Sequence, residues 1–493
     1  MTTVTETLDT ETPDIETPDI ETFDPHRWAA LVVLLTGAFL APLDFFIVNV
    51  AMPSITAGLG ASSAEVQLVI SGYAVVYAVF LITGGRLGDI FGRKQIFLAG
   101  LAGFALASAL CGLAWSPMSL IMGRLLQALA AAFMAPQALA SIHALFPPHE
   151  RGRALSIYGI TLGLASIIGQ LLGGALVGAD LAGLGWRLIF LINLPIAVVA
   201  FATAIPLLRE TRGSHRPHLD LGGVVLSAAA MTALVVPLIE GRERGWPWWT
   251  IAMLAATPLF IELFRRYEIG LAKVGGDPLV AIEVFQSPGL LRGLAAIGTL
   301  YAAAAFFLTF SIYLQAALGR SALQAGMAIL PFSVGFVFGS TFSPAIGRRL
   351  GAAAPSLGFV LSAAGLIATS RVAALAPAGV VPPAALMAPA LLLIGLGMGM
   401  SIPTMVRVVV ERVARHRAGL VGGLVNSTLQ VSAALGVALL GGLFYAIIDG
   451  RTDASAVTHA FSMTLLAIAG CHLGGAALAA GLGQRRPDHE REL

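Results

Sequence analysis

Long apolar segments alternate with short polar ones along the chain from Trp28 almost to its end. Each apolar segment has about 20 residues, the length that an α-helix needs to cross the hydrocarbon core of a bilayer. We expect all of them to be helices, because an open sheet cannot satisfy its backbone hydrogen bonds in lipid. The pattern predicts fourteen membrane-spanning helices, at residues 28–52, 65–84, 95–114, 118–143, 154–178, 187–208, 221–240, 247–266, 293–316, 326–346, 356–374, 384–408, 419–447 and 459–481.

The same pattern divides the chain into two parts. The longest interior loop, at about 267–292, separates the first eight spans from the last six. A Gly-rich, basic loop follows the second span (G-R-L-G-D-I-F-G-R-K, 85–94), and a weaker echo without the acidic residue follows the tenth (P-A-I-G-R-R-L-G, 344–351). Matching loops in two halves are typical of transporters built from duplicated domains.

Charged residues are scarce in this chain. Only 11% of its 493 residues are Asp, Glu, Lys or Arg, and 57% are hydrophobic, whereas ordinary soluble domains carry about 25% charged residues. This composition argues against a water-soluble enzyme, a disordered protein and a nucleic-acid-binding protein. The two cysteines, Cys111 and Cys471, lie far apart in apolar spans, so we expect neither a disulfide framework nor a cysteine metal site.

The net charge of +2 is an average over unlike parts of the chain. Eight Asp and Glu residues, without any Lys or Arg, lie in the first 26 residues, where E-T-P-D-I occurs twice; this tail carries −8 and the remainder +10. Such a polar, Pro-punctuated segment cannot bury enough apolar surface to fold, and it lacks the features of a signal peptide. We predict a disordered acidic tail over 1–27, with a regulatory or docking role as the alternative.

Basic residues predict the orientation in the membrane, because cytoplasmic loops are enriched in Lys and Arg. With the N-terminus inside, 22 basic residues fall on the inner side and six on the outer side. The split predicts that both termini are cytoplasmic. The six outer residues are Arg187, Arg242, Arg244, Arg320, Arg371 and Arg451.

Two charged residues lie well inside predicted spans: Asp44 in 28–52 and Arg124 in 118–143. An ionisable group in such a position costs about 2.5–3.5 kcal/mol on insertion scales, so each needs a reason. At 1.5 Å per residue they lie about 12 and 9 Å from the outer ends of their spans, which is nearly the same depth. The two residues form either a structural ion pair or a proton-and-substrate switch, in which the solvation of the aspartate changes between two conformations.

Other residues within the spans are candidates for a substrate cavity. The polar ones either line a cavity or bridge helices by hydrogen bonds. The aromatic ones either stack on a flat substrate or only pack between helices. The polar candidates are Asn49, Gln127, Gln137 and Asn193, and the aromatic candidates are Phe45, Phe46, Tyr73 and Tyr77.

The loop at 85–94 has the residues of an inner gate. Gly88 and Gly92 permit a tight turn and a close approach of helices. Asp89 can accept hydrogen bonds from a helix N-terminus or pair with Arg93, and such a charge cluster can favour one conformation and be broken in the other. The gate residues are Gly85, Arg86, Gly88, Asp89, Gly92, Arg93 and Lys94.

This loop closely resembles the signature loop of the major facilitator superfamily, in particular of its fourteen-helix drug:proton antiporter branch. L-D-F-F-I-V-N-V-A-M-P-S-I at 43–55 resembles the helix 1 motif of that branch and places Asp44 at its acidic position. R-L-L-Q at 124–127 is similar to the helix 4 motif, whose arginine is implicated in proton transfer. W-R-L-I-F-L-I-N-L-P at 186–195 and A-G-L-V-G-G-L-V-N-S at 418–427 also look like this branch, so the resemblance covers nearly all of 28–481.

The resemblance implies an all-α integral membrane protein with 14 transmembrane helices. Two six-helix bundles occupy 28–208 and 293–481, an inserted helix pair and a cytoplasmic linker occupy 209–292, and tails lie at 1–27 and 482–493. The resemblance also implies a helix 5 motif at Gly169, Gln170, Gly173 and Gly174, and cavity residues at Asn426 and Gln430. Gln170 stands where the branch has a proline, so we expect a different bend there. Leu429 stands where the branch often has arginine.

The function implied by the resemblance is export of amphipathic drugs, antibiotics or toxic metabolites in exchange for protons, by alternating access and without a cofactor. The alternative is a lipid or metabolite transporter of the same fold, including one that works in uptake. A membrane enzyme or sensor is disfavoured, because the sequence has no phosphate loop ending in Gly-Lys-Ser/Thr and no conspicuous nucleophile–base or metal cluster. We expect a monomer in a bacterial inner membrane that contacts a small amphipathic substrate and lipid, but no nucleic acid.

Overall fold

The computed structural model describes residues 25–212, 218–413, 418–451 and 453–482. Within these ranges the chain is helical and contains no strand. The predicted all-α membrane fold is therefore confirmed. Most of the two predicted tails, at 1–24 and 483–493, lies outside the described residues.

The helices follow one another with short connections. They are α1 (Arg27–Leu59), α2 (Ser63–Phe91), α3 (Arg93–Gly112), α4 (Pro117–Leu145), α5 (Pro148–Ala179), α6 (Leu188–Leu191), α7 (Asn193–Leu207), α8 (Leu221–Glu243), α9 (Trp248–Lys273), α10 (Leu290–Tyr301), α11 (Ala304–Ile312), α12 (Ala322–Ala328), α13 (Leu330–Leu350), α14 (Ala353–Leu375), α15 (Ala384–Val410), α16 (Ala418–Gly436), α17 (Gly442–Ile448) and α18 (Ala454–Ala480). Short 3₁₀ segments stand before α6 (η1, Leu181–Gly183, and η2, Gly185–Arg187) and before α10 (η3, Ile282–Gln286).

Helix ends follow the local chemistry of the sequence. Gly60 stops α1 in the left-handed conformation, with φ of 63°. Two residues later α2 begins with a capping box: the Ser62 side chain accepts a hydrogen bond from the Glu65 N–H, and the Glu65 carboxylate accepts one from the Ser62 N–H. The turn between these two long helices therefore needs only three residues.

Several predicted spans are composed of two or three helical pieces. The span 293–316 consists of α10, α11 and a π-helical turn at Tyr313–Ala317 (η4), and the span 419–447 contains a second π-helical turn at Val437–Gly441 (η6). Such turns interrupt the regular hydrogen-bond ladder and occur frequently at functional sites. Both interruptions belong to the C-terminal part of the chain.

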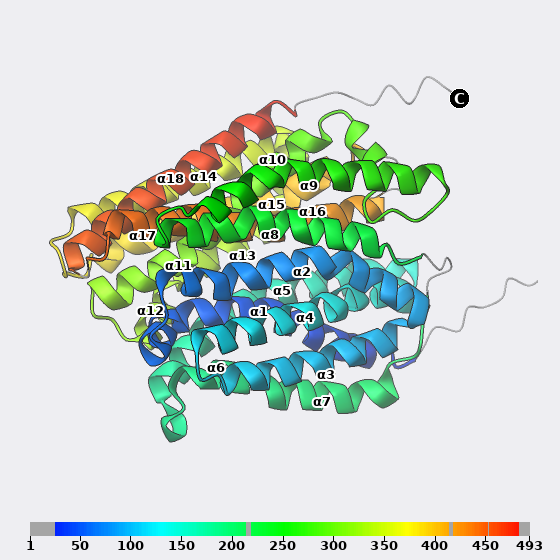
Figure 1. Ribbon diagram of the computed structural model, residues 1–493, viewed down its shortest axis with the longest axis horizontal. Coiled ribbons are helices and arrows are strands. Elements are labelled where there is room, and N and C mark those ends of the chain that lie inside the picture. The colour runs from blue at the N-terminus through cyan, green and yellow to red at the C-terminus, as the bar shows by residue number, and fades with distance from the viewer. Residues whose placement is uncertain (1–24, 213–217, 414–417, 452, 483–493) are drawn as a thin grey trace, which may run out of the picture.

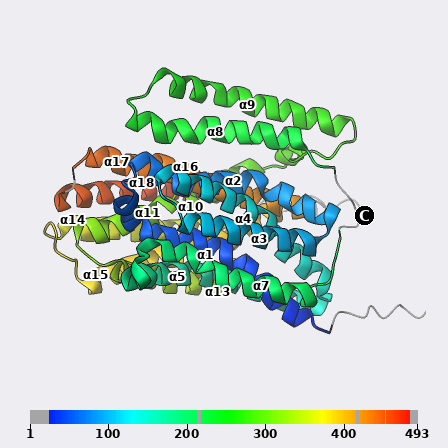
Figure 2. The same cartoon turned by 60° about the horizontal axis from the view of Figure 1, so that its bottom comes forward.

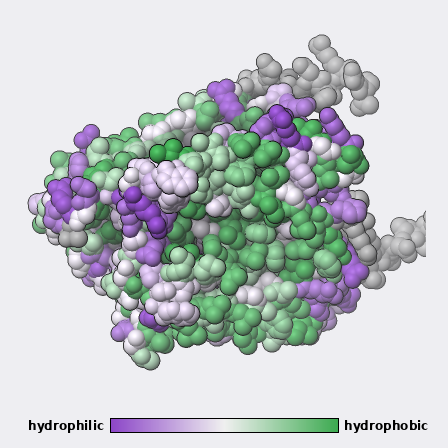
Figure 3. Space-filling view, in the orientation of Figure 1, coloured by the Kyte–Doolittle hydropathy of each residue, from purple (hydrophilic) through white to green (hydrophobic). Residues whose placement is uncertain are grey.

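Thirteen helices in the described ranges are long and apolar enough to cross a membrane. The fourteenth predicted span, 247–266, is also a helix, α9, but it does not reach the same hydropathy. The reason is its charged second half, where Glu262 pairs with Arg265 and Arg266. The molecular surface has a broad hydrophobic band with hydrophilic residues gathered toward its two ends, as expected for a protein embedded in a bilayer (Figure 3).

The helices form two groups with an additional pair on the outside (Figures 1 and 2). One hydrophobic cluster lies within α1–α7 and the segment just after them, and another lies within residues 284–482. A third cluster joins the two groups: it combines residues of α1, α2 and α4 with residues of α8, α11, α16 and η6. Figure 2 shows α8 and α9 lying together beside the two groups.

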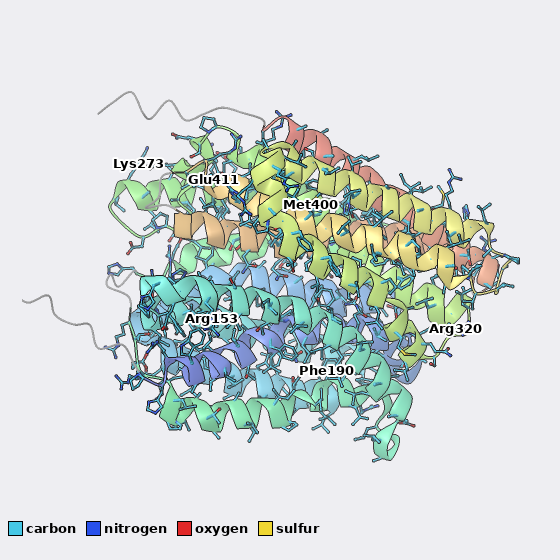
Figure 4. The ribbon with its side chains drawn as sticks, turned by 180° about the vertical axis from the view of Figure 1, so that it is seen from behind. Arg153, Phe190, Lys273, Arg320, Met400 and Glu411 are labelled. Atoms are coloured by element: carbon cyan, nitrogen blue, oxygen red, sulfur yellow. The ribbon has the colours of Figure 1, made fainter. Side chains whose placement is uncertain are left out.

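The molecule has two ends with respect to the long helices. We call the end where α1 begins and α18 finishes the terminal side, and the other end the opposite side (Figure 1). In Figure 4, Lys273 and Glu411 lie near the terminal side and Arg320 near the opposite side. The distribution of basic residues predicts that the terminal side is cytoplasmic.

Candidate functional site

Asp44 and Arg124, the two charged residues predicted to lie within the membrane, form a salt bridge between α1 and α4. Their side chains are fully buried, with exposed fractions of 0% and 1%. A carboxylate and a guanidinium buried without a partner would each lose several kcal/mol of hydration, so contact between them offsets much of this cost. The pair is therefore the electrostatic centre of the N-terminal group of helices.

Three neutral side chains complete a hydrogen-bond network around this pair. Gln127 and Asn193 donate to Asp44 Oδ1 over 2.8 and 3.0 Å. Both amide groups also donate to the Ser108 hydroxyl, over 2.6 and 3.1 Å. The side-chain oxygen of Gln127 accepts a hydrogen bond from Arg124 over 2.7 Å. The network thus joins residues of α1, α3, α4 and α7.

The arginine of this network is enclosed by aromatic rings. The Cζ atom of Arg124 lies 4.2 Å from the centre of the Tyr73 ring and 5.9 Å from that of Phe190. Arg124 Nε also donates to the Val69 carbonyl over 3.3 Å, so α2 contacts the network through two residues. A cation over an aromatic face is worth about 2 kcal/mol when desolvated. These contacts hold the guanidinium on the side facing Asp44.

In this arrangement a change in the protonation of Asp44 would also change the contacts of Arg124. Ionised Asp44 accepts hydrogen bonds from Arg124, Gln127 and Asn193 at once. A proton on Asp44 would remove the negative charge that compensates Arg124 and would occupy one oxygen lone pair. The guanidinium would then gain by moving to water or to another anion. The site therefore has the components of a proton-dependent switch.

Aromatic candidates lie next to this network and reach the other group of helices. The Tyr73 ring stacks on Tyr77 at 6.1 Å between centres and lies 6.4 Å from Phe45. Phe45 contacts Phe46 at 5.3 Å, and Phe46 contacts Phe307 of α11 at 5.1 Å. The four predicted rings thus form a continuous row that ends on a residue of the C-terminal group.

The remaining cavity candidates lie apart from the charge network. Asn49 donates to the Phe45 carbonyl of its own helix over 2.8 Å. Gln137 donates to the Gly84 carbonyl over 2.7 Å and so bridges α4 to α2. Asn426 and Gln430 are half-buried on α16, and the described residues show no hydrogen bond to either side chain. Among the polar candidates, the structure brings only Gln127 and Asn193 to Asp44.

The predicted gate loop is a one-residue break between α2 and α3. Gly92 adopts φ of 116°, and a Cβ atom there would lie 2.4 Å from the Glu210 carboxyl carbon. That carboxylate accepts hydrogen bonds from the N–H groups of Lys94 and Gln95 at the start of α3, over 3.0 and 3.3 Å. Asp89 pairs with Arg93 over 3.0 Å. The glycine is therefore required both by its conformation and by the close approach of Glu210.

The other gate residues attach this loop to neighbouring helices. Gly88 leaves room for the side chain of Gln137, since a Cβ there would lie 1.9 Å from its oxygen. Lys94 Nζ donates to the Ile205 carbonyl over 2.6 Å, and Arg93 donates to the Ala140 carbonyl over 3.0 Å. A Cβ on Gly85 would make only an ordinary contact, 3.8 Å from the Pro136 side chain. Arg86 points away from this cluster, toward the segments that flank α8 and α9.

On the opposite side the two groups of helices are packed together. The Gln315 side chain of η4 donates to the Val50 carbonyl of α1 over 2.9 Å. Glycines of the helix 5 motif permit close approach: a Cβ on Gly173 would lie 2.8 Å from the Ile47 carbonyl oxygen of α1, within the N-terminal group, and one on Gly174 would lie 2.4 Å from that of Ala322 in α12, in the other group. α5 is one continuous helix, and the Gln170 carbonyl packs against Gly326. These contacts close the opposite side of the molecule.

Replacing Gly174 with valine is expected to prevent this closure, because its side chain would overlap the backbone of Ala322. We expect loss of transport by at least about tenfold with normal insertion, measured as substrate flux per amount of purified protein in vesicles. Gly178→Ala is the matched control, since a Cβ there makes only an ordinary contact of 3.7 Å with Leu323. Equal flux in Gly174→Val and the wild type would show that this contact is not needed.

The comparison with known families decides what kind of protein this fold represents. The model of the Major Facilitator Superfamily matches residues 34–437. The chain belongs to this superfamily. The chain is thus a multi-pass membrane transporter.

Curated members of the major facilitator superfamily match the chain over most of its length. The probable actinorhodin transporter of Streptomyces coelicolor is 36% identical over 87% of this chain and 74% of its own. The puromycin resistance protein of Streptomyces alboniger is 36% identical over 89% of this chain and 85% of its own. The tetracenomycin C resistance and export protein of Streptomyces glaucescens is 34% identical over 84% of this chain and 75% of its own.

Solved structures show the same fold at lower identity. A bacterial homolog of the human lysosomal transporter Spinster, in an inward-facing and unoccupied conformation, has a TM-score of 0.69 at 18% identity, covering 93% of this chain and 97% of its own. A structure described for substrate recognition in proton dependent oligopeptide transporters has a TM-score of 0.64 at 13% identity, covering 92% of this chain and 98% of its own. At these identities the likeness shows the major facilitator fold alone.

Sequence reasoning missed several residues of this major facilitator site. Ser108 receives hydrogen bonds from both amides of the network, yet a serine in an apolar span is not distinctive. Glu210 caps α3 from a segment far along the chain, and Phe307 extends the aromatic row from the other group of helices. Of these three residues, Glu210 had a recognisable feature in the sequence. It is an acidic residue just after a predicted span, and a carboxylate is stabilised when it lies at the N-terminus of a helix.

Proposed function

We propose that the protein is a proton-coupled secondary transporter that exports amphipathic drugs or antibiotics across a bacterial inner membrane, with both termini in the cytoplasm. The observation that carries this proposal is the buried Asp44–Arg124 pair with its ring of hydrogen-bond donors. The names of three relatives, which concern actinorhodin, puromycin and tetracenomycin C, support antibiotics as the substrate class.

Alternating access gives the charge pair its role in this proposal. The opposite side is closed by contacts of α1 with η4 and of α5 with α12. Export requires that these contacts open while the terminal side closes. A proton that reaches Asp44 from the outer side weakens its hold on Arg124, which frees α4 to move relative to α1. Release of the proton to the cytoplasm restores the pair and resets the transporter.

The aromatic row supplies the substrate-facing surface in this proposal. Flat amphipathic molecules gain about 0.5–1.5 kcal/mol for each well-placed ring contact beyond burial of their area. The row begins at Tyr73, which also contacts Arg124, so substrate at the rings and proton at Asp44 act on neighbouring groups. The transporter needs no cofactor in this scheme, and we propose that one chain is the working unit.

Inside-out vesicles test the direction and the coupling of transport. With the lumen more acidic than the medium, we expect the vesicles to accumulate a fluorescent amphipathic drug or a labelled antibiotic. For one proton exchanged against one neutral substrate, a gradient of one pH unit sustains accumulation of up to about tenfold. Accumulation that vanishes when a protonophore is added supports the proposal.

Other outcomes of the vesicle experiment identify the alternative functions. Substrate loss from preloaded inside-out vesicles under the same gradient would indicate uptake into the cell, as in a metabolite transporter. Movement of a labelled phospholipid without drug accumulation would indicate a lipid transporter of the same fold. Accumulation that is insensitive to the gradient would contradict proton coupling.

A further inference from the structure

Arg86 of the gate loop makes its contacts with the segments that enter and leave the α8–α9 pair. Its guanidinium donates to the carbonyls of Asp277 over 2.8 Å and His218 over 3.3 Å, and it also hydrogen-bonds to the Pro278 carbonyl. Residue 218 precedes α8, and residues 277 and 278 follow α9. The inserted pair is thereby attached to the terminal end of α2.

Two acidic side chains hold the same segments in place. Asp220, at the N-cap of α8, accepts hydrogen bonds from the N–H groups of Gly223 over 2.7 Å and Leu279 over 2.9 Å. Glu268 of α9 accepts one from the Val280 N–H over 2.9 Å. Successive backbone N–H groups after α9 are thus bound by carboxylates from both helices. The binding of this segment fixes the carbonyls that Arg86 contacts.

The two carboxyl groups lie next to each other in a buried position. Asp220 is 5% exposed and Glu268 is fully buried. A Cβ atom on Gly223 would lie 2.3 Å from both Asp220 Oδ2 and Glu268 Oε1, so only glycine leaves room for the pair. Glu268 Oε1 is buried and receives no hydrogen bond from a donor in the described residues. A proton on that oxygen lets it donate to the neighbouring Asp220 carboxylate.

The two carboxyl groups differ in the direction in which their pKa values are shifted. Glu268 lies beyond the predicted span 247–266, and burial together with the adjacent Asp220 raises the pKa of its carboxyl to about 8. Burial also acts to raise the pKa of Asp220, but hydrogen bonds from the Gly223 and Leu279 N–H groups and from Glu268 outweigh it and hold that pKa below its usual value. At neutral pH the pair therefore shares a single proton, carried by Glu268.

We propose that Asp220 and Glu268 are positioning residues that form a proton-dependent latch, through which the α8–α9 pair holds the gate arginine Arg86. With one shared proton the carboxyl pair binds the segment at 277–280 and presents its carbonyls to Arg86. Loss of that proton places two negative charges side by side in a buried site, which loosens the segment. The gate loop then loses its attachment to the inserted pair.

The charged and titratable groups around the latch agree with this direction. Arg86 approaches from α2, Tyr267 lies beside Asp220 from α9, and Asp277 with its partner His218 lies in the flanking segments. The positive Arg86 favours ionised Glu268, but burial and Asp220 outweigh it. Because the pKa of Glu268 is raised from its ordinary value of 4.5 to about 8, the latch is strongest below about pH 4.5 and weakens as the pH rises from there to about 8, above which both carboxyl groups are ionised and it weakens no further.

Hydrogen exchange measured by mass spectrometry tests the latch on the full-length protein in nanodiscs. The reporter is the peptide that contains the N–H groups of Leu279 and Val280, and Glu268→Gln is the decisive variant because glutamine keeps a neutral donor at every pH. The ratio of exchange rates, wild type over Glu268→Gln at the same pH, is expected to be near 1 at pH 4.5 and to rise to at least about tenfold by pH 8, with no further rise to pH 9. Comparison at equal pH removes the intrinsic pH dependence of exchange.

Glu262→Gln is the matched control, since it removes a carboxylate from the same helix at an exposed surface pair. It is expected to exchange like the wild type at each pH. A wild-type to Glu268→Gln ratio near 1 at pH 9 would overturn the proposal. If Glu268→Gln fails to fold, the wild-type series alone decides, with the turn at 376–383 as internal reference. Exchange at 279–280 that becomes faster relative to that turn as the pH rises from about 5 to 8 supports the latch, and a constant ratio over this range overturns it.

The role of the latch in transport rests on the proposed function, but its existence does not. The exchange experiment needs no substrate and no gradient, so the latch can fail while proton-coupled export stands. Conversely, vesicles without drug accumulation would overturn export and leave the exchange result unchanged. If both hold, Glu268→Gln should keep transport and lose the decline that the latch gives the wild type as the pH rises from about 5 to 8.

Discussion

Asp44→Asn is expected to abolish proton-driven export. It also leaves the buried Arg124 guanidinium without its compensating charge, so we expect a lower unfolding temperature and compare transport per amount of folded protein. Asparagine has nearly the same volume and can still accept from Gln127 and Asn193, but it cannot bind and release a proton. Exchange without a titrating group loses its driving force, so we expect accumulation in acid-loaded inside-out vesicles to fall from up to about tenfold to the protein-free level. Counterflow at equal pH, which needs no net proton movement, should persist at a measurable rate.

Asp449→Asn provides the control for this experiment. Asp449 is an exposed carboxylate with φ of 48° on the opposite side, and asparagine tolerates that conformation as well as aspartate does. It should accumulate substrate like the wild type. Full gradient-dependent accumulation by Asp44→Asn would contradict the role of Asp44 in proton coupling and would leave the buried pair with a structural role only.

Arg124→Gln is expected to destabilise the protein strongly, because it leaves the buried Asp44 carboxylate without its compensating charge. Removing one partner of a buried pair typically costs about 3–5 kcal/mol. Glutamine also cannot reproduce the contacts of the guanidinium with Val69, Gln127 and the Tyr73 ring. Thermal unfolding in detergent measures the effect. With the partly exposed Cys471 replaced by serine, the buried Cys111 supplies the thiol that reacts with a fluorogenic maleimide when the fold opens.

The double variant Asp44→Asn/Arg124→Gln separates stability from transport. Neutralising both partners removes the unpaired charge, so we expect it to recover most of the unfolding temperature lost by Arg124→Gln alone. It should still fail in gradient-driven export, because no titrating group remains at the site. A double variant as unstable as Arg124→Gln would show that the cation contacts, and not the charge balance, dominate the stability of this region.

These outcomes distinguish the two interpretations of the pair that the sequence left open. A purely structural salt bridge predicts that stability and transport change together and return together in the double variant. A proton switch predicts that stability returns and coupled transport does not. The network geometry favours a switch, since Asp44 is bound by two neutral amides that can rearrange in addition to the arginine.

Much of the fold could be read from hydropathy alone. Each predicted span coincides with a helix or a short series of helical pieces, because a run of about 20 apolar residues has few other ways to satisfy its backbone in lipid. The limits were less accurate. α1 continues past the predicted end of the span at 52 to Leu59, where Gly58 lies close to Trp186, so Asp44 lies farther from the end of its helix than from the predicted end of the span. Asp44 and Arg124 nevertheless meet.

The candidate site was predictable only in part. A charge within an apolar span is conspicuous in any sequence, so Asp44 and Arg124 could be named, and the break at Gly92 follows from its local residues. Polar neutral residues carry no such mark. Gln127 and Gln137 lie on one helix and are chemically identical, yet one binds Asp44 and the other bridges to Gly84.

The sequence by itself determined the order of the helical segments, the two charges within the spans and the turn at Gly92, because these depend on hydropathy and backbone conformation over a few neighbouring residues. Only the tertiary structure decided which polar groups meet. Asn193 reaches Asp44, and Arg86 reaches the carbonyls of Asp277 and Pro278 beyond the inserted pair. Such partners lie more than a hundred residues apart, so their contact depends on how whole helices pack, which no local pattern encodes.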